Sequence, residues 1–208
     1  MIDLYTFGTP NGKKASIALE EMGLEYNVHT VNIMKDEQFD PEFLKISPNN
    51  KIPAIVDHET GVSMMESGAI LYYLATKTGQ FLPDDPRQHW TAIEWLNWQM
   101  GGFGPMLGQA NHFLKFNPGK SDYAEKRYGD EAKRLYGVLD TQLSKNEYVA
   151  GEYSIADMAI WPWAARWEWQ NIDMDTLPNL KRWYKQVAAR PAVQRGYSVP
   201  TEAEIPMP

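Results

Sequence analysis

The chain of 208 residues contains no cysteine. A disulfide bond, a thiolate metal site and a protein-borne thiol nucleophile are therefore excluded. Histidine is scarce, and the four histidines, His29, His58, His89 and His112, lie far apart without the short spacing of a histidine metal site. We therefore predict that the protein holds no metal.

Basic residues are fewer than acidic ones, with 20 Lys and Arg against 27 Asp and Glu, which gives a net charge of −7. This sign repels nucleic-acid phosphates and anionic membranes, so we expect neither as a partner. No apolar run approaches the ~20 residues of a membrane span. The first residues also lack a basic segment followed by an apolar stretch. The expected location is cytoplasmic.

The first part of the chain has the pattern of an α/β domain. Ala15, Ala18, Leu19 and Met22 have the spacing of one helix face, and Ser67 is expected to be the N-cap of a second helix. Strands alternate with these helices. We expect strands at residues 2–7, 26–31, 53–56 and 62–65, and helices at residues 15–22 and 67–79.

A proline pair, Pro83 and Pro86, resists continuation of either a helix or a strand. We place a domain boundary there. The predicted organisation is an N-terminal domain at residues 1–80, a linker at residues 81–86 and a C-terminal domain at residues 87–208.

The second part of the chain has helical periodicity throughout, as in the series Tyr128, Ala132, Leu135 and Leu139. All eight tryptophans lie here, and most are expected to pack in the core. Two further features mark one helix of this domain. Ser154 and Asp157 have the spacing of a capping box, and Pro162 predicts a kink or break in the helix that follows.

A polar turn, Gly8-Thr9-Pro10-Asn11-Gly12-Lys13-Lys14, separates the first strand from the first helix and could hold an anion at the helix start. It differs from a nucleotide-binding Walker loop, because it is one residue short and Lys14 replaces the magnesium-binding hydroxyl. Asp57 imitates the second nucleotide motif only superficially. The sequence therefore disfavours nucleotide binding.

Two more clusters could carry chemistry. Pro53 precedes a strand, and the base rate for such a bond favours the trans form, although a cis bond would turn the backbone of Ile52 outward to pair with an extended peptide. Glu66 and Ser67 combine a carboxylate with a helix start, which suits an amino-acid zwitterion. Without further context, an ordinary helix cap is the favoured interpretation of the second pair.

These motifs occur in an order that resembles that of the glutathione transferases, and the resemblance extends over residues 2 to about 195. In detail, the segments 9–13, 98–102 and 104–109 are similar to the bacterial nu-class members, which are disulfide-bond reductases. The resemblance implies a thioredoxin-like N-terminal domain with a mixed four-stranded sheet, followed by an all-helical bundle. It also implies a homodimer that uses glutathione.

Site residues follow from the same resemblance. Pro53 would be cis, Ile52 would pair with the cysteinyl part of glutathione, and Glu66 and Ser67 would hold its γ-glutamyl end. Gln38 and Lys51 match positions that contact the glycyl or peptide part. Thr9 and Asn11 match the residues that face the sulfur. Arg127 matches an arginine near the ligand, but it could equally be a solvated charge on a helix.

The chain departs from transferases that activate the thiol with a tyrosine, serine or cysteine. Tyr5 lies too early in its strand for that role, so we interpret it as structural. Thr9 and Asn11 instead predict weak conjugation of electrophiles. Because thiol–disulfide exchange needs a thiolate and the protein has none, bound glutathione would have to supply it.

The expected activity is therefore a glutathione-dependent disulfide-bond oxidoreductase. A conventional transferase that conjugates electrophiles, and a non-catalytic glutathione-binding regulator, remain alternatives. The sequence identifies neither the physiological disulfide or electrophile nor the dimer interface.

Overall fold

The computed structural model describes all residues from Met1 to Pro208, and they form two compact units. The first unit comprises Met1–Leu82 and Ala188–Ile205, and the second comprises Pro83–Val187 and Pro206–Pro208. No helix combines the length and the apolar character that crossing a bilayer requires. The domain limits inferred from the prolines remain a prediction.

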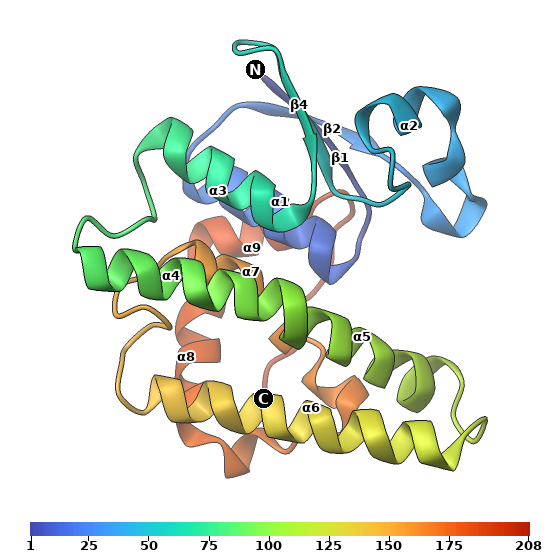
Figure 1. Cartoon of the computed structure of the whole chain (residues 1–208), viewed down its shortest axis with the longest axis vertical. Coiled ribbons are helices and arrows are strands. Elements are labelled where there is room, and N and C mark those ends of the chain that lie inside the picture. The colour runs from blue at the N-terminus through green and yellow to red at the C-terminus, as the bar shows by residue number, and fades with distance from the viewer. The chain divides into compact units, whose positions relative to one another are not determined.

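A mixed sheet of four strands forms the centre of the first unit (Figure 1). Its strands are β1 (Ile2–Thr6), β2 (Tyr26–Thr30), β3 (Ala54–Asp57) and β4 (Val62–Met65). Their order is β2-β1-β3-β4, with β1 and β2 parallel and the other pairs antiparallel. The predicted mixed four-stranded sheet is confirmed, with each strand within a residue of its expected limits.

Two long helices, α1 (Pro10–Glu21) and α3 (Ser67–Thr78), pack against each other in this unit, and the short α2 (Pro41–Ile46) contacts β3 and β4. Alternate residues of β1 are fully buried, as expected of a strand with one face in the core. Helix α1 begins five residues before the predicted start at residue 15. Apolar periodicity does not reveal this start, because the first turn of the helix is polar. Thr9 caps this turn and Pro10 suits the first helical position.

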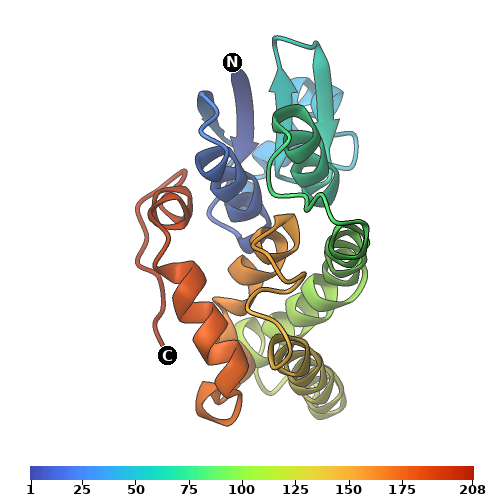
Figure 2. The same ribbon diagram turned by 90° about the vertical axis from the view of Figure 1, so that its left-hand side faces the viewer.

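Helix α9 (Pro191–Tyr197) also belongs to the first unit and packs along α1 (Figure 2). The hydroxyl of Ser16 donates to the carbonyl of Gly196 at 2.7 Å, and the Lys13 ammonium donates to the carbonyl of Tyr197. At the other end of α9, Arg190 forms a two-pronged ion pair with Glu21. The contact between α1 and α9 therefore combines hydrogen bonds to backbone carbonyls with an ion pair.

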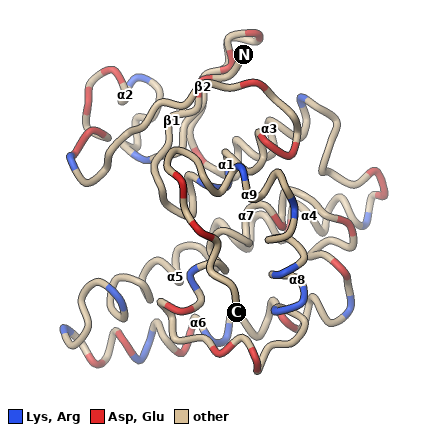
Figure 3. The backbone as a smooth tube through the Cα atoms, turned by 180° about the vertical axis from the view of Figure 1, so that it is seen from behind, with Lys and Arg blue, Asp and Glu red and all other residues tan.

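The second unit is all-helical, as predicted. It contains α4 (Pro86–Trp98), α5 (Gly104–Asn111), α6 (Asp122–Leu143), α7 (Ile155–Ala164) and α8 (Pro178–Ala188), with π-helical turns at Gln99–Phe103 and His112–Phe116. The apolar series from Ala132 to Leu139 is buried on α6. Acidic and basic residues are interspersed along α6, so this helix presents no patch of one sign (Figure 3).

The predicted capping box at the start of α7 is confirmed. The carboxylate of Asp157 accepts hydrogen bonds from the amides of Ser154 and Val149, both at 3.0 Å, and from the indole of Trp183 at 2.8 Å. Burial raises the pKa of Asp157 to about 6, although these hydrogen bonds lower it. Helix α7 continues through Pro162 and ends at Ala164.

Candidate functional site

The strand pairing brings the predicted site segments of the first unit to one end of the sheet. Thr6 pairs with Thr30, Tyr5 pairs with Ala54, and Ala54 pairs with Met65, so the ends of all four strands form one row. Adjacent strands lie about 4.8 Å apart. The segments that leave or enter the sheet here contain Thr9, Gln38, Ile52, Pro53, Glu66 and Ser67.

Thr9 and Asn11 lie at the start of α1. The hydroxyl oxygen of Thr9 accepts a hydrogen bond from the amide of Gly12 at 3.2 Å. A threonine hydroxyl that accepts in this way still has a proton to donate. Together with the positive end of the helix dipole, this turn can stabilise an anion such as a thiolate.

Gly12 is required by the close approach of backbone in this turn. A Cβ atom at this position would lie 2.2 Å from the carbonyl oxygen of Phe7 and 2.4 Å from the hydroxyl of Thr6. Since backbone cannot yield as a side chain can, a larger residue would displace the start of α1. The glycine therefore sets the position of the Thr9 turn above the sheet.

The peptide bond between Ile52 and Pro53 is cis, as the family resemblance implies. Ser47 holds the preceding residue in place, because its hydroxyl donates to the carbonyl of Lys51 at 2.7 Å. The side chain of Ile52 packs against the buried cluster that contains Val31 and Phe43. The loop thus fixes a backbone segment at the entrance to β3.

Glu66 and Ser67 form the start of α3. Glu66, not Ser67, occupies the N-cap position, and its φ of 72° lies in the left-handed region. The prediction of Ser67 as N-cap is wrong, because Ser67 is the first helical residue and its hydroxyl is bound to another side chain. The carboxylate of Glu66 is exposed, whereas Ser67 is buried.

That other side chain is Lys14 of α1. Its ammonium lies 3.3 Å from the hydroxyl oxygen of Ser67, and the residue is only 1% exposed. Burial lowers the pKa of Lys14 well below its usual value, while the carboxylate of Glu66 acts in the opposite direction. The sequence pattern offered Lys14 only as a mismatch to a nucleotide loop, so its place beside Ser67 was missed.

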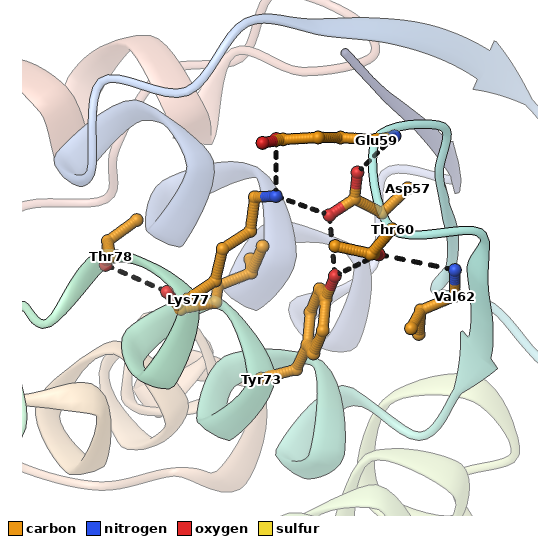
Figure 4. Close-up of polar contacts among 8 residues, drawn as sticks. Asp57, Glu59, Thr60, Val62, Tyr73, Lys77 and Thr78 are labelled. Carbon is orange, nitrogen blue, oxygen red and sulfur yellow. Dashed lines mark hydrogen bonds and ion pairs between the residues drawn. The ribbon is translucent and has the colours of Figure 1, made fainter.

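A polar network holds α3 against the β3–β4 turn (Figure 4). The buried carboxylate of Asp57 accepts from the hydroxyl of Tyr73 at 2.6 Å and from the ammonium of Lys77 at 3.0 Å. Burial raises the pKa of Asp57, but these hydrogen bonds outweigh it and hold the pKa well below the usual range. Asp57, which superficially resembles part of a nucleotide-binding motif, therefore has a structural role in this network.

The remaining predicted residues occupy different settings. Gln38 lies in a short 3₁₀ turn after β2, and its side-chain oxygen is buried without a hydrogen-bond partner. An acceptor of this kind fits a donor on a ligand, such as a peptide amide. Lys51 is exposed at the same end of the sheet.

Arg127 belongs to the second unit. It is exposed on α6 and lines a groove of about 580 Å³ together with Met106 and Tyr123. Acidic side chains of Asp130 and Glu131 line the same groove, so its charge is mixed. Arg127 thus both lines a groove and is exposed to solvent. A contact with the ligand and a solvated charge on the helix therefore remain the two alternatives for this residue.

Tyr5 packs among other rings of the first unit. Its ring stacks on His29 with centroids 4.7 Å apart and packs with Phe43 of α2. Burial, and to a smaller extent Asp3, raises the pKa of Tyr5. These contacts support the structural interpretation of this residue.

No group of three or more acidic or histidine side chains in the structure could hold a metal ion. The chemistry at this end of the sheet is instead that of hydrogen-bond donors, a helix start and an exposed carboxylate. Such a set suits a small peptide that carries both charges.

Comparison with known proteins agrees with this chemistry. Two family models match, the N-terminal domain of glutathione S-transferase over residues 2–76 and its C-terminal domain over residues 103–191. The disulfide-bond oxidoreductase YfcG of Escherichia coli is 50% identical over 198 residues, which cover 92% of each chain.

Solved structures give the same result. A glutathione transferase from Pseudomonas putida, with one glutathione disulfide bound per subunit, has a TM-score of 0.91 and 45% identity, covering 96% of this chain and 91% of that one. A glutathione transferase from Burkholderia graminis, with two glutathione molecules bound per subunit, has a TM-score of 0.90 and 43% identity, covering 97% of this chain and 89% of that one. The chain therefore belongs to the glutathione S-transferase family.

Proposed function

We propose that the protein is a glutathione-dependent disulfide-bond oxidoreductase in which bound glutathione, rather than a protein cysteine, carries out thiol–disulfide exchange. One combination carries this proposal: the sequence has no cysteine, yet it is 50% identical to a disulfide-bond oxidoreductase over 92% of its length. Similar structures hold glutathione in one case and glutathione disulfide in another. These are the reduced and oxidised forms that such an exchange interconverts.

The reaction consumes two glutathione molecules for each disulfide reduced. The thiolate of the first attacks one sulfur of the substrate and forms a mixed disulfide, while the other sulfur leaves as a thiolate and takes up a proton. The thiolate of the second attacks the glutathione sulfur of the mixed disulfide and releases the second substrate thiol. The products are two thiols and one glutathione disulfide, so the two electrons come from glutathione.

Within this proposal, the protein positions glutathione and favours its thiolate. Thr9 and Asn11 would donate hydrogen bonds to the sulfur at the positive end of α1, which lowers the pKa of a bound thiol. The backbone of Ile52, ahead of Pro53, would pair with the cysteinyl part. The other proposed contacts are Gln38 and Lys51 with the glycyl or peptide part, Glu66 and Ser67 with the γ-glutamyl end, and Arg127 with the ligand from the helical unit.

The test is an assay of the purified protein with glutathione against a small disulfide, hydroxyethyl disulfide, and against an aromatic halide, 1-chloro-2,4-dinitrobenzene. Disulfide reduction is expected to be much faster than conjugation. Faster conjugation would indicate a conventional transferase. Glutathione binding without either activity would indicate a regulator.

The double variant Thr9→Ala with Asn11→Ala tests the proposed roles at the sulfur. We expect turnover to fall by roughly 10²-fold, the effect of removing positioned donors from a developing anion, with the Kd for glutathione changed far less. The variant Asp85→Ala is a matched control, because it removes the cap of another helix, α4, which belongs to the second unit. Unchanged turnover in the double variant with intact glutathione binding would refute these roles.

We also propose that the protein is a cytoplasmic homodimer, on the strength of the family resemblance and the sequence composition. Light scattering after size-exclusion chromatography should then give twice the chain mass of 23.8 kDa. A mass equal to one chain would refute the dimer.

A further inference from the structure

Lys14 is a buried lysine directly beside the proposed γ-glutamyl site. It is 1% exposed, and its ammonium lies 3.3 Å from the hydroxyl oxygen of Ser67 at the start of α3. Removing a lysine from water is costly, so a buried lysine requires compensating partners or a function. The burial of Lys14 therefore indicates that this residue has a specific structural or functional role.

The direction of the hydrogen bond between these residues follows from their chemistry. An ammonium group can only donate, so the hydroxyl of Ser67 accepts from Lys14 and directs its own proton elsewhere. The first turn of α3 adds the partial positive charge of a helix N-terminus at the same place. A cation, a polarised hydroxyl and a helix start thus act together where a carboxylate would bind.

The neighbouring lysine provides a contrast within the same helix. Lys13 is also buried, but its ammonium donates to the backbone carbonyl of Tyr197 and lies 4.3 Å from the centre of the Tyr197 ring. Consecutive residues of a helix point in different directions, so Lys13 reaches α9 while Lys14 reaches α3. Lys13 therefore fastens α9, whereas Lys14 lies at the proposed ligand site.

We propose that Lys14 is a positioning residue that makes the pocket selective for the α-carboxylate of the γ-glutamyl group, acting through the hydroxyl of Ser67. This inference rests on the proposed function, because it assumes that glutathione binds with its γ-glutamyl end at Ser67. Lys14 does not touch the reacting sulfur. Its effect is therefore on which ligand binds rather than on the exchange step itself.

The carboxylate of Glu66 is the acidic group that acts on Lys14 from the α3 side and supports its charged form against the effect of burial on its pKa. Glu66 is also the acceptor proposed for the ligand ammonium. The two charges of the ligand would thus meet complementary groups, the carboxylate near Ser67 and Lys14 and the ammonium near Glu66. Only the first of these contacts depends on Lys14.

The test compares two ligands that differ in one group. One is glutathione, and the other is its analogue with a 4-aminobutyryl residue in place of γ-glutamyl, which lacks only the α-carboxylate. Calorimetry gives the Kd of each for the wild type and for the variants Lys14→Met and Lys14→Gln. We expect both variants to lose at least about tenfold of the preference for glutathione, because they lack the charge that favours the carboxylate.

The choice of variants keeps the result decisive. Lys14→Gln retains a donor that can reach toward Ser67, so it separates the effect of charge from that of a missing buried hydrogen bond, and it serves if Lys14→Met does not fold. Lys13→Met is the matched control, since the same substitution one residue away should lower stability but keep the ligand preference. Lys14→Arg, which restores a cation, should recover part of that preference.

The possible outcomes separate this inference from the proposed function. A wild type that binds neither ligand would overturn both. A wild type that prefers glutathione, with the same preference in the neutral Lys14 variants, would overturn the role of Lys14 alone. Equal losses in the Lys13 and Lys14 variants would also overturn it, because they would indicate a general loss of structure.

Discussion

Replacement of Gly196 by alanine should separate α9 from α1. A Cβ atom at Gly196 would lie 2.6 Å from the Cα atom of Ile17 and 2.7 Å from its nitrogen, both much shorter than a van der Waals contact. These atoms are backbone of a buried helix, so they cannot move aside as a flexible side chain could. The α9 helix would have to shift, and the hydrogen bond from Ser16 to the Gly196 carbonyl would lengthen or break.

The expected loss of stability combines three contributions. Overpacking in a close contact costs about 1–3 kcal/mol and more where backbone must move. The lost hydrogen bond adds about 1 kcal/mol. The higher helix propensity of alanine returns up to about 1 kcal/mol. The net expectation is a decrease of roughly 1–4 kcal/mol in the free energy of unfolding, or roughly 2–16 °C in Tm for a chain of this size.

Thermal unfolding followed by circular dichroism measures this decrease, and hydrogen exchange locates it. Amides of α1 should exchange faster in Gly196→Ala than in the wild type. Gly137→Ala is the matched control, because Gly137 lies inside α6 and a Cβ there would meet nothing within 4 Å. That substitution should be neutral or stabilising by up to about 1 kcal/mol.

The free energy of unfolding is therefore expected to decrease in Gly196→Ala and to stay the same or increase in Gly137→Ala. Equal Tm values for Gly196→Ala and the wild type, with unchanged exchange in α1, would show that α9 is not held by this close contact. The attribution of α9 to the first unit as an integral layer would then be wrong.

Three further predictions concern buried or partly buried polar groups. Because the pKa of Asp157 is raised to about 6 in the folded state, the wild type should gain up to about 3 kcal/mol of stability as the pH falls from about 6 to about 4, and Asp157→Asn should lack this gain in urea titrations at several pH values. Asp3 has the opposite sign, since hydrogen bonds, chiefly from Asn27, lower its pKa to about 2 despite burial; its contribution should be lost between about pH 4 and pH 2, a loss that Asp3→Asn should not show. Tyr73→Phe removes the 2.6 Å hydrogen bond to Asp57 and should cost about 1.5–3 kcal/mol in the same titrations, and an unchanged midpoint would contradict the importance of that bond.

Local patterns in the sequence predict most of the fold. Strands such as β4 are short apolar segments between turn residues, and helices such as α6 have a long apolar stripe, so their location follows from periodicity. Apolar periodicity predicts the start of α1 too late, because the first turn of this helix has no apolar side chain to continue the pattern. The return of α9 to α1 could not be predicted, because it depends on contacts between residues about 180 positions apart, such as Ser16 and Gly196.

The candidate site could be predicted only in part for a similar reason. Thr9, Pro53 and Ser67 are predicted as site residues because each belongs to a recognisable motif at the end of a strand or helix. The convergence of these motifs follows from the strand order, which the sequence does not state. Lys14 was missed because a lysine in a helix is usually solvated, and only the packing of α1 against α3 makes it buried and places it beside Ser67.

The position of α9 has a consequence for how the protein is made. A ribosome finishes residues 1–82 early, yet the layer that covers one side of α1 is translated only after the whole helical unit. At a translation rate of about 5–20 residues per second, residues 188–205 are complete roughly 6–25 s after residue 82. During that interval the face of α1 that includes Ser16 and Ile17 lacks its contact with α9.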